Sequence, residues 1–105
     1  MSKKLPPIHP GEHLRGAFMI PSGLSSNALA RALNVTPARS NEIVRERRGI
    51  TADTALRLAR FFNTSHQFWL NLQCNYDVQC AEDAAGRAIT RIRPLPKAIE
   101  HGSPA

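Results

Sequence analysis

Residues 29–44 read LARALNVTPARSNEIV, in which two short helical patterns are separated by a tight turn. In the first pattern, Leu29 and Leu33 are four residues apart and lie on one face of a helix. Asn34 follows as a residue that tolerates the left-handed backbone conformation in which helices commonly end. Thr36 is a typical N-cap, and a proline at the next position suits the first turn of a new helix. The run therefore predicts two helices joined by a turn.

The second helix of this pair is predicted from Pro37 to about Arg45, and the residues at the corner fit a helix-turn-helix. Ala30 is small where the second helix would cross closely, Val35 would fill the corner, and Ile43 would anchor the second helix to the core. In that arrangement the outer face of the second helix is free to enter the major groove of DNA.

Several residues of the pair are candidates for contacts with DNA. Arg39 could bond a guanine edge, Asn41 could pair with adenine, and Glu42 could accept from cytosine or orient an arginine. Arginines at the helix exit and polar residues at the two helix starts would meet phosphates. The candidate set is Asn27, Thr36, Pro37, Ala38, Arg39, Asn41, Glu42, Arg45, Arg47 and Arg48. The alternative is a solvated face on which Glu42 and Glu46 balance the arginines.

Three more helices are predicted around the pair. The first runs from Pro10 to about Met19 and ends at the sequence Pro-Ser-Gly. Another follows an N-cap at Thr51, and the last runs from an N-cap at Ser65 to about Glu82. The predicted fold class is therefore all-α.

The character of the chain changes after residue 84. Residues 87–93, RAITRIR, are rich in β-branched side chains and partly alternating, and prolines follow at positions 94 and 96. We therefore expect an extended strand there, which would pair with a partner chain. The predicted organisation is an N-terminal arm over 1–9, a helical domain over 10–84, and an extended or disordered tail over 85–105.

Composition limits the classes of function. The 105 residues include 14 Lys and Arg against 8 Asp and Glu, a net charge of +6 that favours a polyanionic partner. No apolar run or signal segment indicates a membrane or secretion, so we expect a soluble cytoplasmic protein. Cys74 and Cys80 are expected to be buried, reduced thiols. With no metal-ligand cluster or catalytic constellation, the sequence predicts no metal, no cofactor, no enzyme activity and no small-molecule substrate.

Three segments together resemble a known family. They are HPGEHL at 9–14, the residues from Ala28 to Val35, and ERRGITADTALRLARFFNTSHQFWLNLQCNYD at 46–77. These stretches are similar to the HigA-type antitoxins of the lambda-repressor-like helix-turn-helix superfamily, and the match covers about residues 9–80. The resemblance implies a five-helix domain, here followed by a short extended C-terminal segment.

The same resemblance implies a function. HigA-type antitoxins generally form homodimers, bind an operator in their own promoter, and neutralise a HigB toxin, a RelE-like ribonuclease that cuts messenger RNA. Double-stranded operator DNA and a HigB-type toxin are the expected partners, with a nucleoid-associated location in the cytoplasm. A free-standing repressor without a toxin is the main alternative, and a structural or RNA-binding helical protein would use the same basic charge.

Three positions depart from the family pattern: Asn34 replaces the usual glycine, His13 stands where an aliphatic residue is common, and the third is Ser40. Ser40 stands in the second helix where an apolar residue normally faces the core. A serine there loses about 1–3 kcal/mol of burial unless its hydroxyl bonds to the preceding turn. Ser40 therefore bears on how the second helix packs.

The last predicted helix offers a second surface. One face, with aromatic residues such as Trp69, would close the core, and a further set of apolar residues lies on nearly the opposite face. The candidate contacts to a dimer mate or a toxin are Leu70, Cys74, Val78, Ile89 and Ile92. The alternative is that the N-terminal arm or the tail folds over this face.

Overall fold

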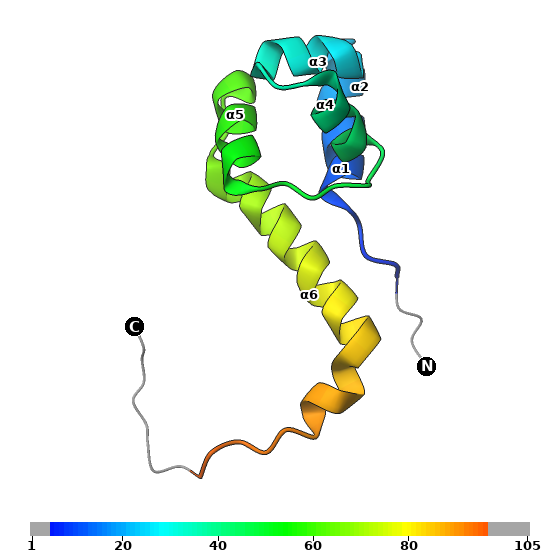
Figure 1. Ribbon diagram of the computed structural model, residues 1–105, viewed down its shortest axis with the longest axis vertical. Coiled ribbons are helices and arrows are strands. Elements are labelled where there is room, and N and C mark those ends of the chain that lie inside the picture. The colour runs from blue at the N-terminus through cyan, green and yellow to red at the C-terminus, as the bar shows by residue number, and fades with distance from the viewer. Residues whose placement is uncertain (1–4, 97–105) are drawn as a thin grey trace.

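The computed structural model describes residues 5–96 and contains, over that range, helices and the loops between them (Figure 1). The elements are α1 (Pro10–His13), η1 (Leu14–Met19), α2 (Ile20–Ser22), α3 (Ser26–Leu33), α4 (Pro37–Val44), α5 (Ala52–Phe62) and α6 (His66–Thr90). Because α1, η1 and α2 are continuous, the described chain forms five helical segments, which confirms the all-α five-helix prediction. Parts of the predicted arm and tail, residues 1–4 and 97–105, lie outside the described residues.

Side-chain caps fix the starts of the later helices. Ser25, Thr36, Thr51 and Ser65 each accept the backbone N–H three residues further on, at 3.1, 3.1, 3.4 and 3.1 Å. Each cap satisfies a backbone donor that the first helical turn leaves without a partner. The helix starts predicted from Thr36, Thr51 and Ser65 are confirmed.

The first helical segment extends further than predicted. It was expected to end near Met19, but it continues to Ser22 through a π-helical stretch in which Ile20 N–H bonds to Arg15 O, five residues back. Pro21 has no N–H, and its ring would clash with the carbonyl four residues earlier in an α-helix. The wider π turn accommodates the proline. The segment ends at Gly23, whose φ of 67° is left-handed.

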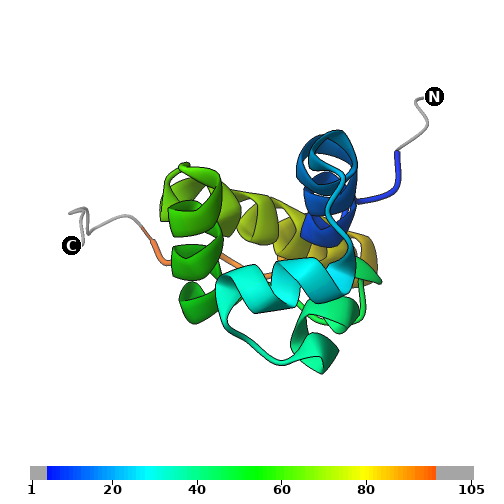
Figure 2. The same cartoon turned by 90° about the horizontal axis from the view of Figure 1, so that it is seen from above.

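The core is centred on Trp69, which α6 contributes and which is fully buried. Its indole Nε1 donates to Thr64 Oγ1 at 2.8 Å, so the polar atom of the buried ring has a partner. The ring of Phe18 packs at 4.9 Å between centroids, and Leu14, Leu29 and Leu58 are also fully buried. Viewed from above, α6 lies between α1 and α5, with the α3–α4 pair on one side (Figure 2).

The strand expected over residues 87–93 is absent, because α6 remains helical to Thr90. The regular part of the helix ends at the break at Ala85, three residues beyond the predicted end near Glu82, and a second, shorter helical stretch follows it to Thr90. The strand preference of Ile89 and Thr90 is weak and depends on context, so it does not prevail here. The helix is broken once, at Ala85 (φ −134°, ψ 15°), and its distal part extends away from the other helices (Figure 1).

The cysteine prediction was also wrong. Both thiols are free, as expected, but Cys74 is exposed and Cys80 is only half-buried. Both residues lie on α6 beyond Trp69, where the helix leaves the core.

Within residues 5–96, no group of three or more His, Cys, Asp or Glu side chains is arranged to hold a metal ion. None of the helices in that part of the chain is both long and apolar enough to cross a membrane.

Candidate nucleic-acid interface

The turn between α3 and α4 has the predicted backbone conformation. Asn34 is left-handed, with φ 58° and ψ 48°, and reverses the chain immediately after α3. Val35 N–H then bonds to Ala30 O at 3.0 Å, which closes the corner. Thr36 caps α4 directly afterwards. The two helices are therefore joined by a short, fully hydrogen-bonded turn.

Ser40 joins the two helices by hydrogen bonds. It is 2% exposed, and its hydroxyl donates to Ser26 O at 2.9 Å, with Ser26 Oγ at 3.2 Å. The expected partner was the turn just before α4, whereas the observed partner is the first residue of α3. A buried hydroxyl with a partner avoids the desolvation penalty of an unpaired polar group. The polar contact thus takes the place of the apolar packing that is usual at this position.

The candidate residues of α4 lie on the side away from the core. Ser40 and Ile43 face inward and are buried. Arg39 and Glu42 are half-buried because each contacts a neighbouring loop or helix. The exposed candidates are Asn27, Thr36, Pro37, Ala38, Asn41, Arg45, Arg47 and Arg48.

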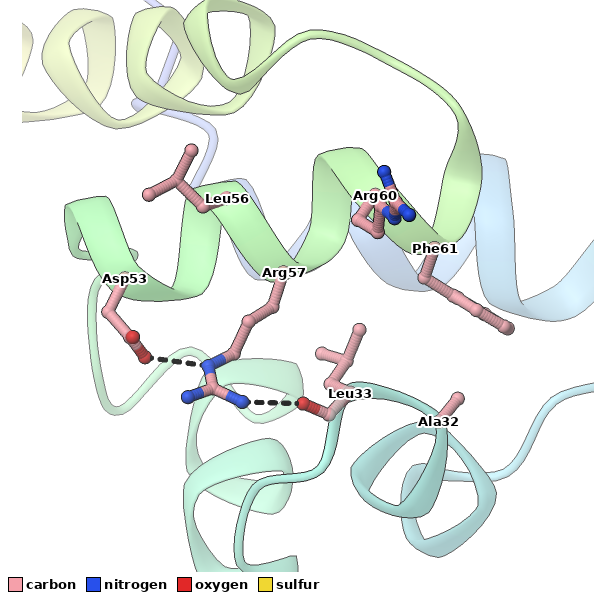
Figure 3. A pocket seen from close by; sticks show the side chains of 7 residues that line it. All are labelled: Ala32, Leu33, Asp53, Leu56, Arg57, Arg60 and Phe61. Atoms are coloured by element: carbon pink, nitrogen blue, oxygen red, sulfur yellow. Dashed lines mark hydrogen bonds and ion pairs between the residues drawn. The ribbon is translucent and has the colours of Figure 1, made fainter.

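Arg39 is held by a carboxylate from α5. Its Nη1 donates to Asp53 Oδ2 at 2.7 Å, and Arg57 Nε donates to the same oxygen at 2.9 Å. Arg57 Nη1 also bonds to Leu33 O at 2.9 Å, at the end of α3 (Figure 3). The hydrogen bonds from Arg57 and Arg39 lower the pKa of Asp53. This network links three helices, and it orients the Arg39 side chain before any ligand binds.

Asp53 was not among the residues predicted for the site. Asp53 is fourteen residues from Arg39, in a separate helix, so its proximity depends on the tertiary fold. The one local signal was the i, i+4 spacing of Asp53 and Arg57, which is common on solvent-exposed helix faces.

The other arginines of the site differ in their partners. Arg48 contacts Glu42 Oε1 through Nε at 2.9 Å and Nη2 at 2.7 Å, so Glu42 orients an arginine in the unbound protein. Arg45 and Arg47 are exposed and form no ion pair with any residue in 5–96. These two side chains are therefore free to meet an anion.

The α1–η1 segment supports the exit of α4. Gly11 packs so closely that a Cβ there would overlap Ile43 O, which explains the need for glycine. Arg15 donates to Val44 O, and its Nη2 pairs with Glu46 Oε2 at 2.9 Å. Glu46 itself is left-handed, with a φ of 64°. The arginine thus fixes the segment in which α4 ends.

His9 caps α1 and was not predicted to have this role. Its Nδ1 accepts Gly11 N–H at 2.9 Å, which requires that nitrogen to be unprotonated. The ring is 6% exposed and packs edge-on against Tyr76, with 4.8 Å between centroids. Burial lowers the pKa of His9, which favours the neutral form that makes the cap.

The candidate interface residues of α6 fall into two groups. Leu70 is half-buried and packs against the core. Cys74 and Val78 are exposed on α6, and Ile89 and Ile92 are exposed towards and beyond its end. Residues 5–9 lie against the opposite face, beside Leu72, Tyr76 and Gln79, so the described part of the arm leaves Cys74 and Val78 uncovered.

An additional apolar surface lies on α5. Leu56 is 57% exposed and Phe61 is 42% exposed, and both line a shallow groove between α5 and the end of α3 (Figure 3). Leu56 therefore does not contribute to the buried core, although it lies in the apolar sequence of its helix. Leu58 and Ala55 provide the buried contacts instead.

Comparison with known proteins agrees with this geometry. A helix-turn-helix family model matches residues 17–69. Virulence-associated protein I of Dichelobacter nodosus is 61% identical over 92 residues, covering 88% of this chain and 84% of that protein. The Pseudomonas aeruginosa antitoxin HigA, solved with the higBA promoter, is 53% identical with a TM-score of 0.82, covering 85% of this chain and 98% of that one. A Haemophilus influenzae relative described as an uncharacterized HTH-type transcriptional regulator is 38% identical over 72 residues, covering 69% of this chain and 67% of that protein.

The fold and the α3–α4 pair define a helix-turn-helix protein of the lambda-repressor-like class. Within that class, the chain is similar over most of its length to proteins described as HigA antitoxins. The chain belongs to the family of HigA-type antitoxins.

Proposed function

We propose that this protein binds operator DNA through α4 and acts as the antitoxin of a toxin–antitoxin pair. The observation that carries the proposal is the outer face of α4, where Arg39 is oriented by Asp53 beside exposed Asn41 and two free arginines. The P. aeruginosa HigA structure, which was solved with a promoter, supports it by similarity. The net charge of +6 also suits a polyanionic partner.

In the proposed complex, the side chains of the site divide into those that contact bases and those that contact phosphates. Arg39 presents a planar fork that matches the O6 and N7 acceptors of guanine, and Asn41 matches adenine. Arg45 and Arg47 contact phosphates at the end of α4, while Asn27 and Thr36 lie at the starts of the two helices, where backbone N–H groups attract phosphate. Arg48 and Glu42 act together, because they are already paired. The helix enters the groove with its N-terminal residues towards the bases.

The protein binds DNA as a homodimer in this proposal. Half-sites on a repressor operator repeat about every 34–36 Å, one turn of DNA, and a two-fold dimer presents its recognition helices at that spacing. A symmetric pair also doubles the number of phosphate contacts, so operator affinity falls steeply with salt. DNA binding places the protein with the nucleoid in the cytoplasm.

The antitoxin role requires a separate surface that binds a HigB-type, RelE-like toxin. Family membership supports this part of the proposal. The test is expression of the open reading frame next to the gene, with and without this protein. Growth arrest by the neighbour, and recovery when this protein is co-expressed, is the expected result. A matched arm with Arg39→Ala separates the two activities, because loss of operator binding should leave toxin neutralisation intact.

A second candidate is a repressor without a toxin partner. The H. influenzae relative described only as an HTH-type transcriptional regulator favours it. The co-expression experiment distinguishes the two, since a neighbour that does not affect growth leaves the repressor function alone. If the protein binds its own promoter no more tightly than unrelated DNA, both candidate functions are contradicted.

A further inference from the structure

The loop between α4 and α5 carries Arg47 and Arg48, and it begins with a fixed turn. Glu46, whose backbone is left-handed, donates its N–H to Ile43 O at 2.9 Å, and Arg47 N–H bonds to Glu42 O at 2.8 Å. These two hydrogen bonds form a Schellman motif, which closes the end of a helix. The hydrogen bonds of the turn therefore fix the first half of the loop, as far as Arg47.

The second half of the loop is held by a side chain of α6, which the loop crosses (Figure 1). Ile50 N–H donates to Gln73 Oε1 at 2.6 Å. A Cβ added at Gly49 would lie 3.0 Å from both Oε1 and Nε2 of Gln73, so close that the amide would have to shift. Ile50 is 3% exposed, and a buried N–H without a partner costs free energy. Gln73 therefore anchors the loop at Gly49 and Ile50.

Asp77 fixes the orientation of the Gln73 amide. Gln73 Nε2 donates to Asp77 Oδ1 at 2.9 Å, one turn further along α6. A carboxylate only accepts hydrogen bonds, so it directs Nε2 towards itself and leaves Oε1 to accept from Ile50 N–H. Neither Gln73 nor Asp77 belongs to the outer face of α4, and neither was predicted for the site.

We propose that Gln73 is a positioning residue for DNA binding, which holds the loop so that Arg47 and Arg48 meet phosphates at the exit of α4. This inference rests on the operator binding proposed above and adds a determinant of it on α6. Arg47 is exposed and forms no ion pair within the described part of the chain, and Arg48 is already paired with Glu42. A loop that is ordered before binding loses less entropy in the complex. Because phosphates occur in every sequence, Gln73 affects affinity and leaves sequence preference unchanged.

The salt dependence of DNA binding by the full-length protein tests this role. Gln73→Ala removes the anchor, and Gly49→Ala displaces the same amide from the side of the loop. Gln67→Ala is the matched control, because Gln67 lies on the same helix but its amide donates to Asn71, at 3.0 Å, within α6. Binding of each variant to the promoter fragment and to a scrambled fragment is measured over a series of salt concentrations.

Gln73→Ala should weaken binding about 3- to 10-fold on both fragments, which corresponds to the loss of one hydrogen bond. The slope of log Kd against log salt should fall by about 1, as expected when one phosphate contact is lost. Gly49→Ala should lower the slope in the same direction, and Gln67→Ala should match the wild type. A variant that is only less stable keeps its slope, because its folded molecules make every contact. An unchanged slope in Gln73→Ala, or a loss confined to the promoter fragment, would therefore overturn the proposal.

An exchange of the two polar groups on α6 provides a rescue. In the double variant Gln73→Glu with Asp77→Asn, the new carboxylate accepts from Ile50 N–H and from the new amide, so both hydrogen bonds and the net charge are kept. This variant should recover the wild-type slope, and a slope as low as that of Gln73→Ala would contradict the anchor.

The wild-type protein separates this inference from the proposed function. Equal binding of the wild type to the promoter and scrambled fragments would contradict operator recognition, and the slopes on both fragments would still test Gln73. Preference for the promoter together with equal slopes for the wild type and Gln73→Ala would contradict the role of Gln73 alone.

Discussion

Asp53 Oδ2 lies 2.7 Å from Arg39 Nη1, so a carboxylate of α5 holds the arginine that α4 presents to the exterior. Arg57 bonds to the same carboxylate and to Leu33 O, which ties this pair to the end of α3. An arginine fixed in one orientation loses less side-chain entropy when it binds a base. Asp53, a residue of α5, therefore orients the Arg39 side chain of α4 before DNA binds.

Replacing Asp53 should reduce specificity more than affinity. In Asp53→Asn, Arg39 loses its charged partner, and the removal of a negative charge also favours DNA of any sequence. We expect the ratio of operator affinity to random-DNA affinity to fall about 3- to 10-fold. This is a part of the discrimination that one bidentate contact to a base provides. Fluorescence anisotropy with both DNAs measures it. An unchanged ratio would show that Asp53 does not position Arg39.

The contact of Gly11 with α4 should be intolerant of any side chain. In Gly11→Ala the new methyl group overlaps Ile43 O, which forces α1 away from α4. The expected loss is about 1–3 kcal/mol in the free energy of unfolding. Gly16→Ala is the matched control, since its Cβ meets nothing within 4 Å. Urea denaturation measures the free energy of unfolding of the two variants. Equal stability of Gly11→Ala and Gly16→Ala would contradict the close approach of Gly11 to Ile43 O.

The buried hydroxyl of Ser40 should contribute measurably to stability. Ser40→Ala removes the hydrogen bond to Ser26 O with little change in volume, so we expect a loss of about 0.5–1.5 kcal/mol. For a domain of this size, that corresponds to a fall in Tm of several degrees. Differential scanning calorimetry measures the change. A Tm equal to or above the wild-type value would mean that apolar packing suffices there.

Stability should depend on pH through His9. Its pKa is lowered in the folded state by burial, with Arg15 acting in the same direction and Glu46 and Asp77 opposing. The unfolded chain therefore binds the proton more readily, and the stabilisation is complete only above the unfolded pKa of about 6.5. Stability declines as the pH falls from about 6.5 towards the folded-state value.

The variant His9→Asn isolates this effect. Asparagine caps helices well but does not titrate, so it should flatten the decline in Tm between about pH 7 and 5. The two proteins differ only at residue 9, so the comparison isolates the contribution of this position. Parallel Tm profiles for the two proteins would assign the pH dependence to other groups.

Much of the fold is encoded in local signals. Ser25, Thr36, Thr51 and Ser65 begin helices wherever the chain leads into an apolar pattern, and Asn34 alone indicates the turn of the helix pair. These signals act over three or four residues, so they can be recognised in the sequence without knowledge of the tertiary structure.

The features that sequence reasoning missed depend on distant contacts or on context. Asp53 of α5 reaches Arg39 of α4 only through the tertiary fold, and the ring of the capping residue His9 packs against the distant Tyr76. Residues 87–93 were assigned to a strand from preferences such as those of Ile89 and Thr90, but the chain up to Thr90 forms a helical stretch beyond the break at Ala85. In each case the local pattern was compatible with more than one outcome.

The most direct test of DNA recognition by α4 is the effect of Arg39→Ala on two affinities. Binding of the variant to the protein's own promoter fragment and to a scrambled fragment is measured at the same salt concentration. We expect the binding free energy to weaken by about 1–3 kcal/mol on the promoter and by much less on the scrambled DNA. Arg60→Ala, an exposed arginine of α5, controls for net charge. Equal losses on both DNAs would contradict base recognition by Arg39.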